Sequence, residues 1–114
     1  MDRISKNLKD FMVLFEFIST IKEVKLRTKL LKQLNSNDKF NRAVREVAFN
    51  IVERNIPLSS KDKALLRPFG PAILKLARAS NPSKRSQVVQ KGKGVVLTSV
   101  LSALAFKILN GLLN

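Results

Sequence analysis

Several side chains that carry much of protein chemistry are missing from this sequence. The 114 residues contain no cysteine, histidine, tryptophan or tyrosine. Without cysteine the chain can form no disulfide and no thiolate metal site. Without histidine it also lacks the commonest general base and transition-metal ligand. No P-loop, zinc-protease or nucleophile-elbow motif occurs. We therefore expect a protein that is not an enzyme and carries no cofactor and no metal.

Acidic residues are also scarce, and the last of them is Asp62. Lys and Arg number 22 against 8 Asp and Glu, which gives a net charge of +14. Residues 63–114 hold nine basic residues and no acidic one. Such asymmetry predicts an electrostatic role for the C-terminal half. A charge of this size indicates an anionic partner, either nucleic acid or an anionic membrane surface.

The spacing of apolar residues predicts helices along the whole chain, with no alternation long enough for a strand. We expect helical segments over 4–21, 22–34, 39–55, 60–67, 71–79, 83–90 and 95–114. The spacing of Ser59 and Asp62 is close to that of a capping box at a helix start. Asn55 can take the left-handed conformation that ends a helix, and Pro68 and Pro71 should break or kink the helix near Arg67. The predicted fold is all-α, a compact bundle of four or five short helices with a C-terminal apolar helix.

This reading divides the chain into a helical bundle (1–80), a basic glycine-containing hinge (81–94) and an apolar C-terminal helix (95–114). The apolar stripes predict the residues of the core. They are Leu8, Phe11, Phe15, Ile18, Leu31, Leu34, Phe40, Val44, Val47, Ile51, Leu65, Ile73 and Leu76.

Two basic clusters are candidate nucleic-acid contacts. The first is a lysine stripe with helical spacing, made of Lys22, Lys25, Lys29 and Lys32, which is either a solvated face or a ridge that faces phosphates. The second surrounds the glycines Gly92 and Gly94 of the hinge and consists of Lys84, Arg85, Lys91 and Lys93, which is either a phosphate clamp or a solvated linker. No aromatic residue lies among them, so base stacking is not expected. The pattern favours double-stranded DNA bound without sequence specificity.

The segment from Val95 to Asn114 is apolar at 13 of its 20 positions, with Lys107 as its only charge. As a helix it would reach roughly 30 Å, which matches a bilayer core in length. Three roles stay open: packing on the bundle as core, docking on the inner face of a capsid, or insertion into an anionic membrane by a swing about the hinge. The residues that would dock are Val96, Leu97, Val100, Leu101, Leu104, Ile108 and Leu112.

The order of several segments resembles a small basic protein of Polinton/Maverick elements and adintoviruses, which are adenovirus-like DNA viruses of animals. The resemblance covers most of residues 24–113. Its parts are a basic helix ("KLRTKLLKQL"), an Ala/Val-rich helix ending in Asn ("NRAVREVAFNIVERN"), a "NIPLS" turn, a leucine-rich basic helix, a "KR…VVQKG" segment and a terminal apolar stretch. The chain departs from its relatives in two places. Lys93 separates Gly92 from Gly94, and Pro68, Gly70 and Pro71 interrupt the leucine-rich helix.

The resemblance implies a non-enzymatic virion protein, comparable to the small basic core proteins with which adenoviruses condense their genome. On this basis we expect a protein that condenses double-stranded DNA, links it to capsid proteins, and resides in the virion and, during assembly, in the host nucleus. The alternatives are a membrane-active entry protein and a structural linker inside the capsid. A homo-oligomer is also open, because the seven Phe could fill a monomer core or seal a dimer.

Overall fold

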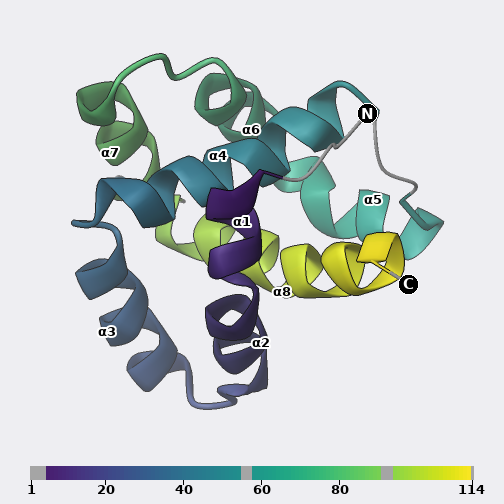
Figure 1. Cartoon of the computed structure of the whole chain (residues 1–114), viewed down its shortest axis with the longest axis horizontal. Coiled ribbons are helices and arrows are strands. Elements are labelled where there is room, and N and C mark those ends of the chain that lie inside the picture. The colour runs from purple at the N-terminus through teal and green to yellow at the C-terminus, as the bar shows by residue number, and fades with distance from the viewer. Residues whose placement is uncertain (1–4, 55–57, 91–93, 114) are drawn as a thin grey trace.

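Helices make up nearly all of the structure, and no β-strand occurs among the residues that it describes (Figure 1). The computed structural model describes residues 5–54, 58–90 and 94–113, the last eight of these as backbone alone. Its radius of gyration is 12.8 Å, close to the value of about 13 Å expected for a compact domain of this length. The all-α compact bundle is therefore confirmed.

The first predicted helix is split in two at Phe11. Helix α1 (Lys6–Asp10) and helix α2 (Met12–Thr20) meet at this residue, whose φ and ψ are −93° and 1°. The Ser5 hydroxyl caps α1 by accepting the Leu8 N–H at 3.0 Å. The break lets the two halves of one apolar stripe pack on different helices, since α1 lies against α4 and α2 against α8. Periodicity alone cannot reveal such a break, because the stripe continues through it.

Helices α3 (Val24–Leu34) and α4 (Asp38–Val52) follow, and Asn37 caps α4 by accepting the N–H groups of Lys39 and Phe40. The turn between them buries Asn35, whose side chain donates to the Val89 carbonyl at 3.0 Å. After α4 the residue with positive φ is Arg54, at 56°. The predicted left-handed residue, Asn55, lies outside the described residues.

Helix α5 (Ser60–Leu66), the 3₁₀ turn η1 (Arg67–Phe69) and helix α6 (Gly70–Ala77) confirm the predicted break at Arg67. Ser59 and Asp62 form the capping box, with each side chain bonded to the other's backbone N–H. The prediction that Leu65 is core is wrong, because this side chain is 50% exposed while Leu66 is buried. The reason is helical phase: Asp62 is buried, and Leu66, four residues later, shares its face.

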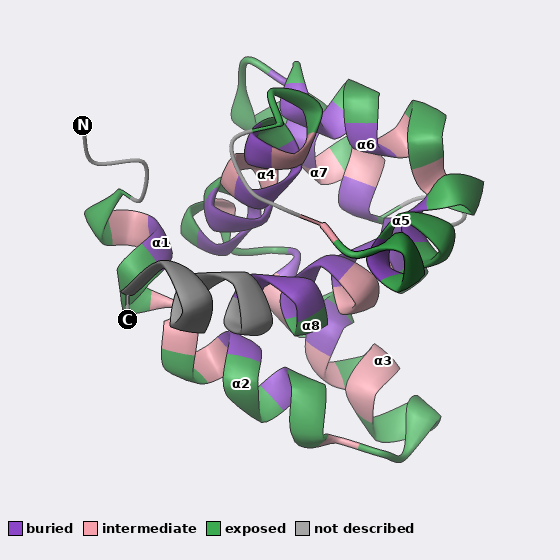
Figure 2. Cartoon of the chain, turned by 90° about the vertical axis from the view of Figure 1, so that its right-hand side faces the viewer, coloured by how far each residue is buried: buried purple, intermediate pink, exposed green. Residues whose placement is uncertain are grey.

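Helix α7 (Pro82–Gln90) and helix α8 (Gly94–Leu113) complete the chain. Where the sequence predicts a hinge over 81–94, most of the segment is helix packed on α4, α6 and α8. Helix α8 contacts α2 and α3 on one side and α4, α6 and α7 on the other (Figures 1 and 2). The apolar segment is thus a central part of the bundle rather than an appendage, because its described half supplies core side chains to both sides.

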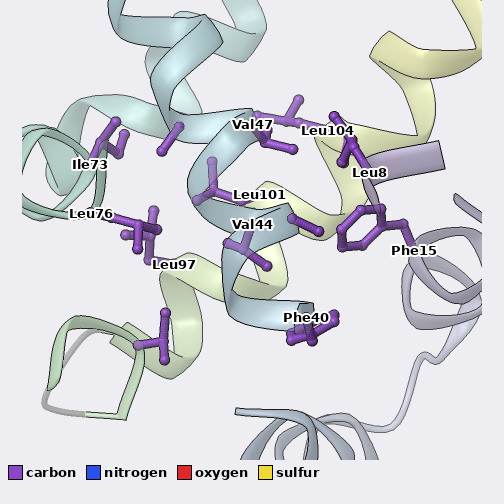
Figure 3. Close-up of a cluster of buried hydrophobic side chains, with 14 of the residues drawn as sticks. Leu8, Phe15, Phe40, Val44, Val47, Ile73, Leu76, Leu97, Leu101 and Leu104 are labelled. Atoms are coloured by element: carbon purple, nitrogen blue, oxygen red, sulfur yellow. The ribbon is translucent and has the colours of Figure 1, made fainter. Parts of the chain in front are cut away.

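The buried core includes side chains from each of the helices α1 to α8, and those labelled in Figure 3 come from α1, α2, α4, α6 and α8. Its largest members are aromatic: the ring centroid of Phe40 lies 5.6 Å from that of Phe11 and 5.8 Å from that of Phe15. Most of the predicted core residues are buried. Three other predicted core residues, Phe11, Leu34 and Ile51, are only half-buried and pack against the buried cluster.

Candidate nucleic-acid interface

The predicted lysine stripe forms one exposed ridge along α3. We call Lys22, Lys25, Lys29 and Lys32 the lysine ridge; all four are exposed, and none takes part in an ion pair among the described residues. At 3.6 residues per turn, Lys29 and Lys32 project within about 40° of Lys25, and Lys25 to Lys32 spans about 10 Å. Lys22 lies just before the helix, in the turn after α2. The ridge thus presents three lysines on one face of α3 and a fourth at its start to solvent.

Two features hold the ridge in place. Leu31 is buried on the opposite side of α3, where the helix packs against α8. The guanidinium of Arg27 donates to the Ile21 carbonyl at 3.0 Å, which ties α3 to the turn that precedes it. Arg27 is therefore used to fix the α2–α3 turn, while the lysines on the outer face remain open to a partner.

Arg85 does not fit its predicted role as a phosphate contact. Its side chain is only 10% exposed and forms a two-pronged pair with Asp38, with Nε–Oδ1 and Nη2–Oδ2 distances of 2.9 and 3.0 Å. The planar fork of arginine matches a carboxylate in this way. The pair joins α7 to the start of α4, so Arg85 serves the fold. The sequence pattern "SKRS" gave no sign of this, because its partner lies 47 residues away.

Lys84, the neighbour of Arg85, is exposed, whereas Lys91 and Lys93 lie outside the described residues. Lys84 stands at the edge of a cavity of about 340 Å³ between α6 and α7, the α6–α7 cavity. Two further cations, Lys75 and Arg78, line the same cavity. Sequence reasoning did not single these two out. The available signal was their spacing of three residues, which places two cations on the same side of a helix.

Part of the small acidic complement is used inside the fold. Asp38 pairs with Arg85, Asp62 is buried in the capping box, and the Glu46 carboxylate accepts hydrogen bonds from the Ser5 backbone N–H and hydroxyl. These carboxylates are therefore engaged by internal partners. The pairing of Asp38 with Arg85 leaves the net charge of the surface unchanged, whereas the burial of Asp62 removes one acidic group from it.

The docking residues predicted on the C-terminal segment fall into three groups. Leu97, Leu101 and Leu104 are buried in the core, Val100 is half-buried, and Val96 is 55% exposed. Ile108 and Leu112 lie where side chains are not described. Two polar residues of the segment, Thr98 and Ser102, are buried with their hydroxyls hydrogen-bonded. The Thr98 hydroxyl donates to the Gly94 carbonyl at 2.8 Å, and the Ser102 hydroxyl donates to the Thr98 carbonyl at 2.7 Å. Over this half, packing as core is the alternative that the structure supports.

Of the two predicted hinge glycines, Gly92 lies outside the described residues and Gly94 is the first residue of α8. A Cβ on Gly94 would lie 2.0 Å from the Val88 carbonyl oxygen and 2.9 Å from that of Val89. The residue therefore allows the start of α8 to touch the end of α7. Its small size serves close packing, which is the opposite of a swing.

The described residues contain no group of three or more acidic side chains placed to hold a metal ion. No single described helix is long and apolar enough to cross a membrane, and one bent pair, Pro82–Gln90 with Gly94–Ala105, meets the criteria by length and composition only.

Comparison of the chain with protein-family models, with curated proteins and with solved structures found no match.

Proposed function

We propose that this protein is a non-enzymatic, virion-associated basic protein that binds and condenses double-stranded DNA without sequence specificity. The observation that carries the proposal is the lysine ridge, four exposed ammonium groups, three of them on one face of α3, with no ion-pair partner among the described residues. Lysines of this kind neutralise phosphates and release condensed counterions, which is the sequence-independent part of DNA binding. No aromatic side chain belongs to the ridge, so it would not distinguish bases by stacking.

Condensation follows from the charge of the whole molecule. Each copy brings a net charge of +14 on a body with extents of 33 × 31 × 28 Å, and a duplex carries one negative charge per about 1.7 Å of its axis. A copy lying over about 30 Å of duplex would face roughly 18 phosphates, so it would cancel most of their charge. Neutralisation of that extent removes the repulsion that keeps duplexes apart.

The virion and the host nucleus, as places of action, rest on the resemblance to the adintovirus and Polinton protein. A link to capsid proteins would use surface outside the buried positions of α8, because Leu97, Leu101 and Leu104 are taken by the core. The test is whether the protein co-purifies with packaged DNA from purified particles. Its absence from particles would remove the virion part of the proposal and leave the DNA-binding part standing.

DNA binding is tested by a salt titration with a duplex of random sequence, read by fluorescence anisotropy. The ridge variant changes all four ridge lysines to Gln. We expect the slope of log K against log salt to become shallower by about 3.6, because each phosphate contact contributes about 0.9. Between 50 and 200 mM salt, the ridge should therefore account for a factor of about 150 in the fall of the affinity.

The matched control removes the same number of charges from exposed lysines elsewhere. It carries Lys6→Gln, Lys39→Gln, Lys61→Gln and Lys63→Gln, all at exposed positions. We expect its slope to lie much closer to that of the unmodified protein. Equal slopes for the ridge variant and the control would show that the ridge is not the interface. Weak binding of the unmodified protein at low salt would refute DNA binding altogether.

Condensation is read separately, by light scattering from long DNA as protein is added. The unmodified protein and the control should condense DNA near charge neutrality, and the ridge variant should require more protein. Vesicles of anionic lipid, loaded with a dye, test the membrane-active alternative in the same series. Dye release without DNA condensation would favour that alternative instead.

A further inference from the structure

The α6–α7 cavity has a composition that phosphate binding does not explain. Its lining combines three apolar residues, Leu74, Ala79 and Val88, which we call the apolar floor, with the three cations Lys75, Arg78 and Lys84, which we call the cationic rim, and with Gln87. The rim cations are exposed, and none of them has an ion-pair partner among the described residues. The phosphates of a nucleic-acid backbone would pair with the cations of the rim but would leave the apolar surface of the floor in contact with water. A ligand with an apolar side chain next to a carboxylate would cover the floor and also pair with the rim.

The outer face of α2 has the complementary composition. Val13 is 79% exposed and Phe17 is 55% exposed. Glu16, also exposed, forms no ion pair among the described residues. Residues three and four apart lie side by side on a helix, so Val13, Glu16 and Phe17 form one patch. The patch therefore places an exposed phenyl ring and an exposed valine directly beside a carboxylate.

We propose that the α2 face of one copy docks into the α6–α7 cavity of a second copy, with Phe17 on the apolar floor and Glu16 against the cationic rim. The sizes agree. A cavity of about 150 Å³ accepts a benzene ring, so the 340 Å³ of the α6–α7 cavity holds the Phe17 ring with room for an aliphatic neighbour. The charges agree as well, since Glu16 is one acid meeting three unpaired cations.

The two surfaces lie at opposite ends of the molecule. In two views at right angles, α2 is at the bottom of the bundle and α6 and α7 are at the top beside α4, with α8 between α2 and these three helices (Figures 1 and 2). A contact between two different surfaces is heterologous, and it continues from copy to copy unless its rotation closes a ring. The expected assembly is therefore a head-to-tail chain. This docking does not depend on DNA binding. In such a chain of copies, each copy would contribute its own lysine ridge, so that one duplex could contact several of them.

Salt should affect docking and DNA binding in opposite directions. Copies with a net charge of +14 repel one another at low ionic strength. At about 0.3 M salt the Debye length is about 6 Å, so this general repulsion is screened while apolar contact persists. We therefore expect self-association without DNA to strengthen from 50 mM to about 0.3 M salt, where DNA binding weakens.

The test is sedimentation velocity over a range of protein concentrations at about 0.3 M salt. Phe17→Asp removes the docking side chain, and Leu74→Asp, at a position 36% exposed, blocks the floor of the cavity. Both residues are partly exposed, so we expect unchanged urea midpoints, which are measured first. The matched control is Val24→Asp, an apolar position that is 62% exposed on α3 and belongs to neither surface. Each docking variant should be monomeric, whereas the control should associate like the unmodified protein.

The decisive measurement mixes the two docking variants. Phe17→Asp keeps an intact cavity and Leu74→Asp keeps an intact α2 face, so a head-to-tail contact predicts a one-to-one complex and nothing larger. A mixture that stays monomeric, or a single variant that still forms chains, would overturn the proposal. So would a monomeric unmodified protein at about 0.3 M salt, or loss of association in the Val24 control.

The charge contact has its own check. Glu16→Gln should weaken association about five-fold or less, as expected for the loss of one rim ion pair. Glu16→Lys should weaken it further, because it sets a fourth cation against the rim, and Lys84→Glu in the partner copy should restore part of that loss. No recovery in the paired variants would mean that Glu16 does not face the cationic rim, and the stated orientation would be refuted.

Discussion

Replacing Gly94 by alanine separates two accounts of the α7–α8 junction. If the glycine serves as a hinge, alanine should be tolerated or even stabilising, because it reduces the freedom of the unfolded chain by about 0.4–1 kcal/mol. In the structure, however, the added Cβ would lie 2.0 Å from the Val88 carbonyl oxygen, 2.8 Å from the Val89 carbonyl carbon and 2.9 Å from the Val89 oxygen. All three atoms belong to the backbone, so no side-chain rotation can relieve the clash.

The cost follows from what must move. Overpacking of a tight contact costs about 1–3 kcal/mol, and here the end of α7 must retreat from the start of α8. The same end of α7 is held by the hydrogen bond of 3.0 Å from the Asn35 side chain to the Val89 carbonyl. Straining a buried bond of this kind adds about 1 kcal/mol. We therefore expect Gly94→Ala to lower the free energy of unfolding by about 2–4 kcal/mol.

Gly70→Ala is the matched control. A Cβ on Gly70 meets no atom outside its chain neighbours within 4 Å, and its φ and ψ of −46° and −56° are helical. The entropic gain of alanine is opposed by the restriction that Pro71 places on the residue before it. We expect a net change within about 1 kcal/mol of zero.

Equilibrium unfolding in urea measures both variants. With a slope of about 1.5 kcal/mol per molar, the Gly94 variant should lose roughly 2 M from its midpoint, while the Gly70 variant should stay near the unmodified protein. A Gly94 variant within about 0.5 kcal/mol of the unmodified protein would refute the close-packing argument and restore the hinge.

Three further substitutions test how the bundle is held together. Asp38→Ala leaves the guanidinium of Arg85 mostly buried without its carboxylate, and we expect a loss of about 2–3 kcal/mol in urea unfolding, while a loss below about 0.5 kcal/mol would contradict a structural role for the pair. Ser59→Ala removes the cap of α5 and should cost about 1 kcal/mol, visible as a fall of about 4 °C in the melting temperature. Leu101→Ala should cost about 2–5 kcal/mol, and a neutral result would place α8 outside the core.

Much of the secondary structure could be predicted from local signals. The 3.6-residue spacing predicted α3 and α4, the Ser59–Asp62 capping box predicted the start of α5, and the prolines around Gly70 predicted one break. These signals are local because hydrogen bonds within a few residues of the chain carry them. The split at Phe11 had no such signal.

The candidate interface was predictable only in part. The lysine ridge could be read from spacing, because residues that share one face of a helix are set by helix geometry alone. Arg85 could not be distinguished from Lys84 in this way. Both are cations one residue apart, yet one is buried against Asp38 and the other is exposed.

The sequence by itself determined the helical class, the cationic excess and the line of lysines, because composition and short-range periodicity are properties of the chain before it folds. Tertiary structure decided the rest. It made the apolar C-terminal segment the centre of the bundle, turned Gly94 from a hinge into a packing position, and placed Lys75 and Arg78 beside Lys84 at one cavity. Each of these depends on which helices meet, and contacts between residues far apart in sequence are fixed only when the apolar faces pack together.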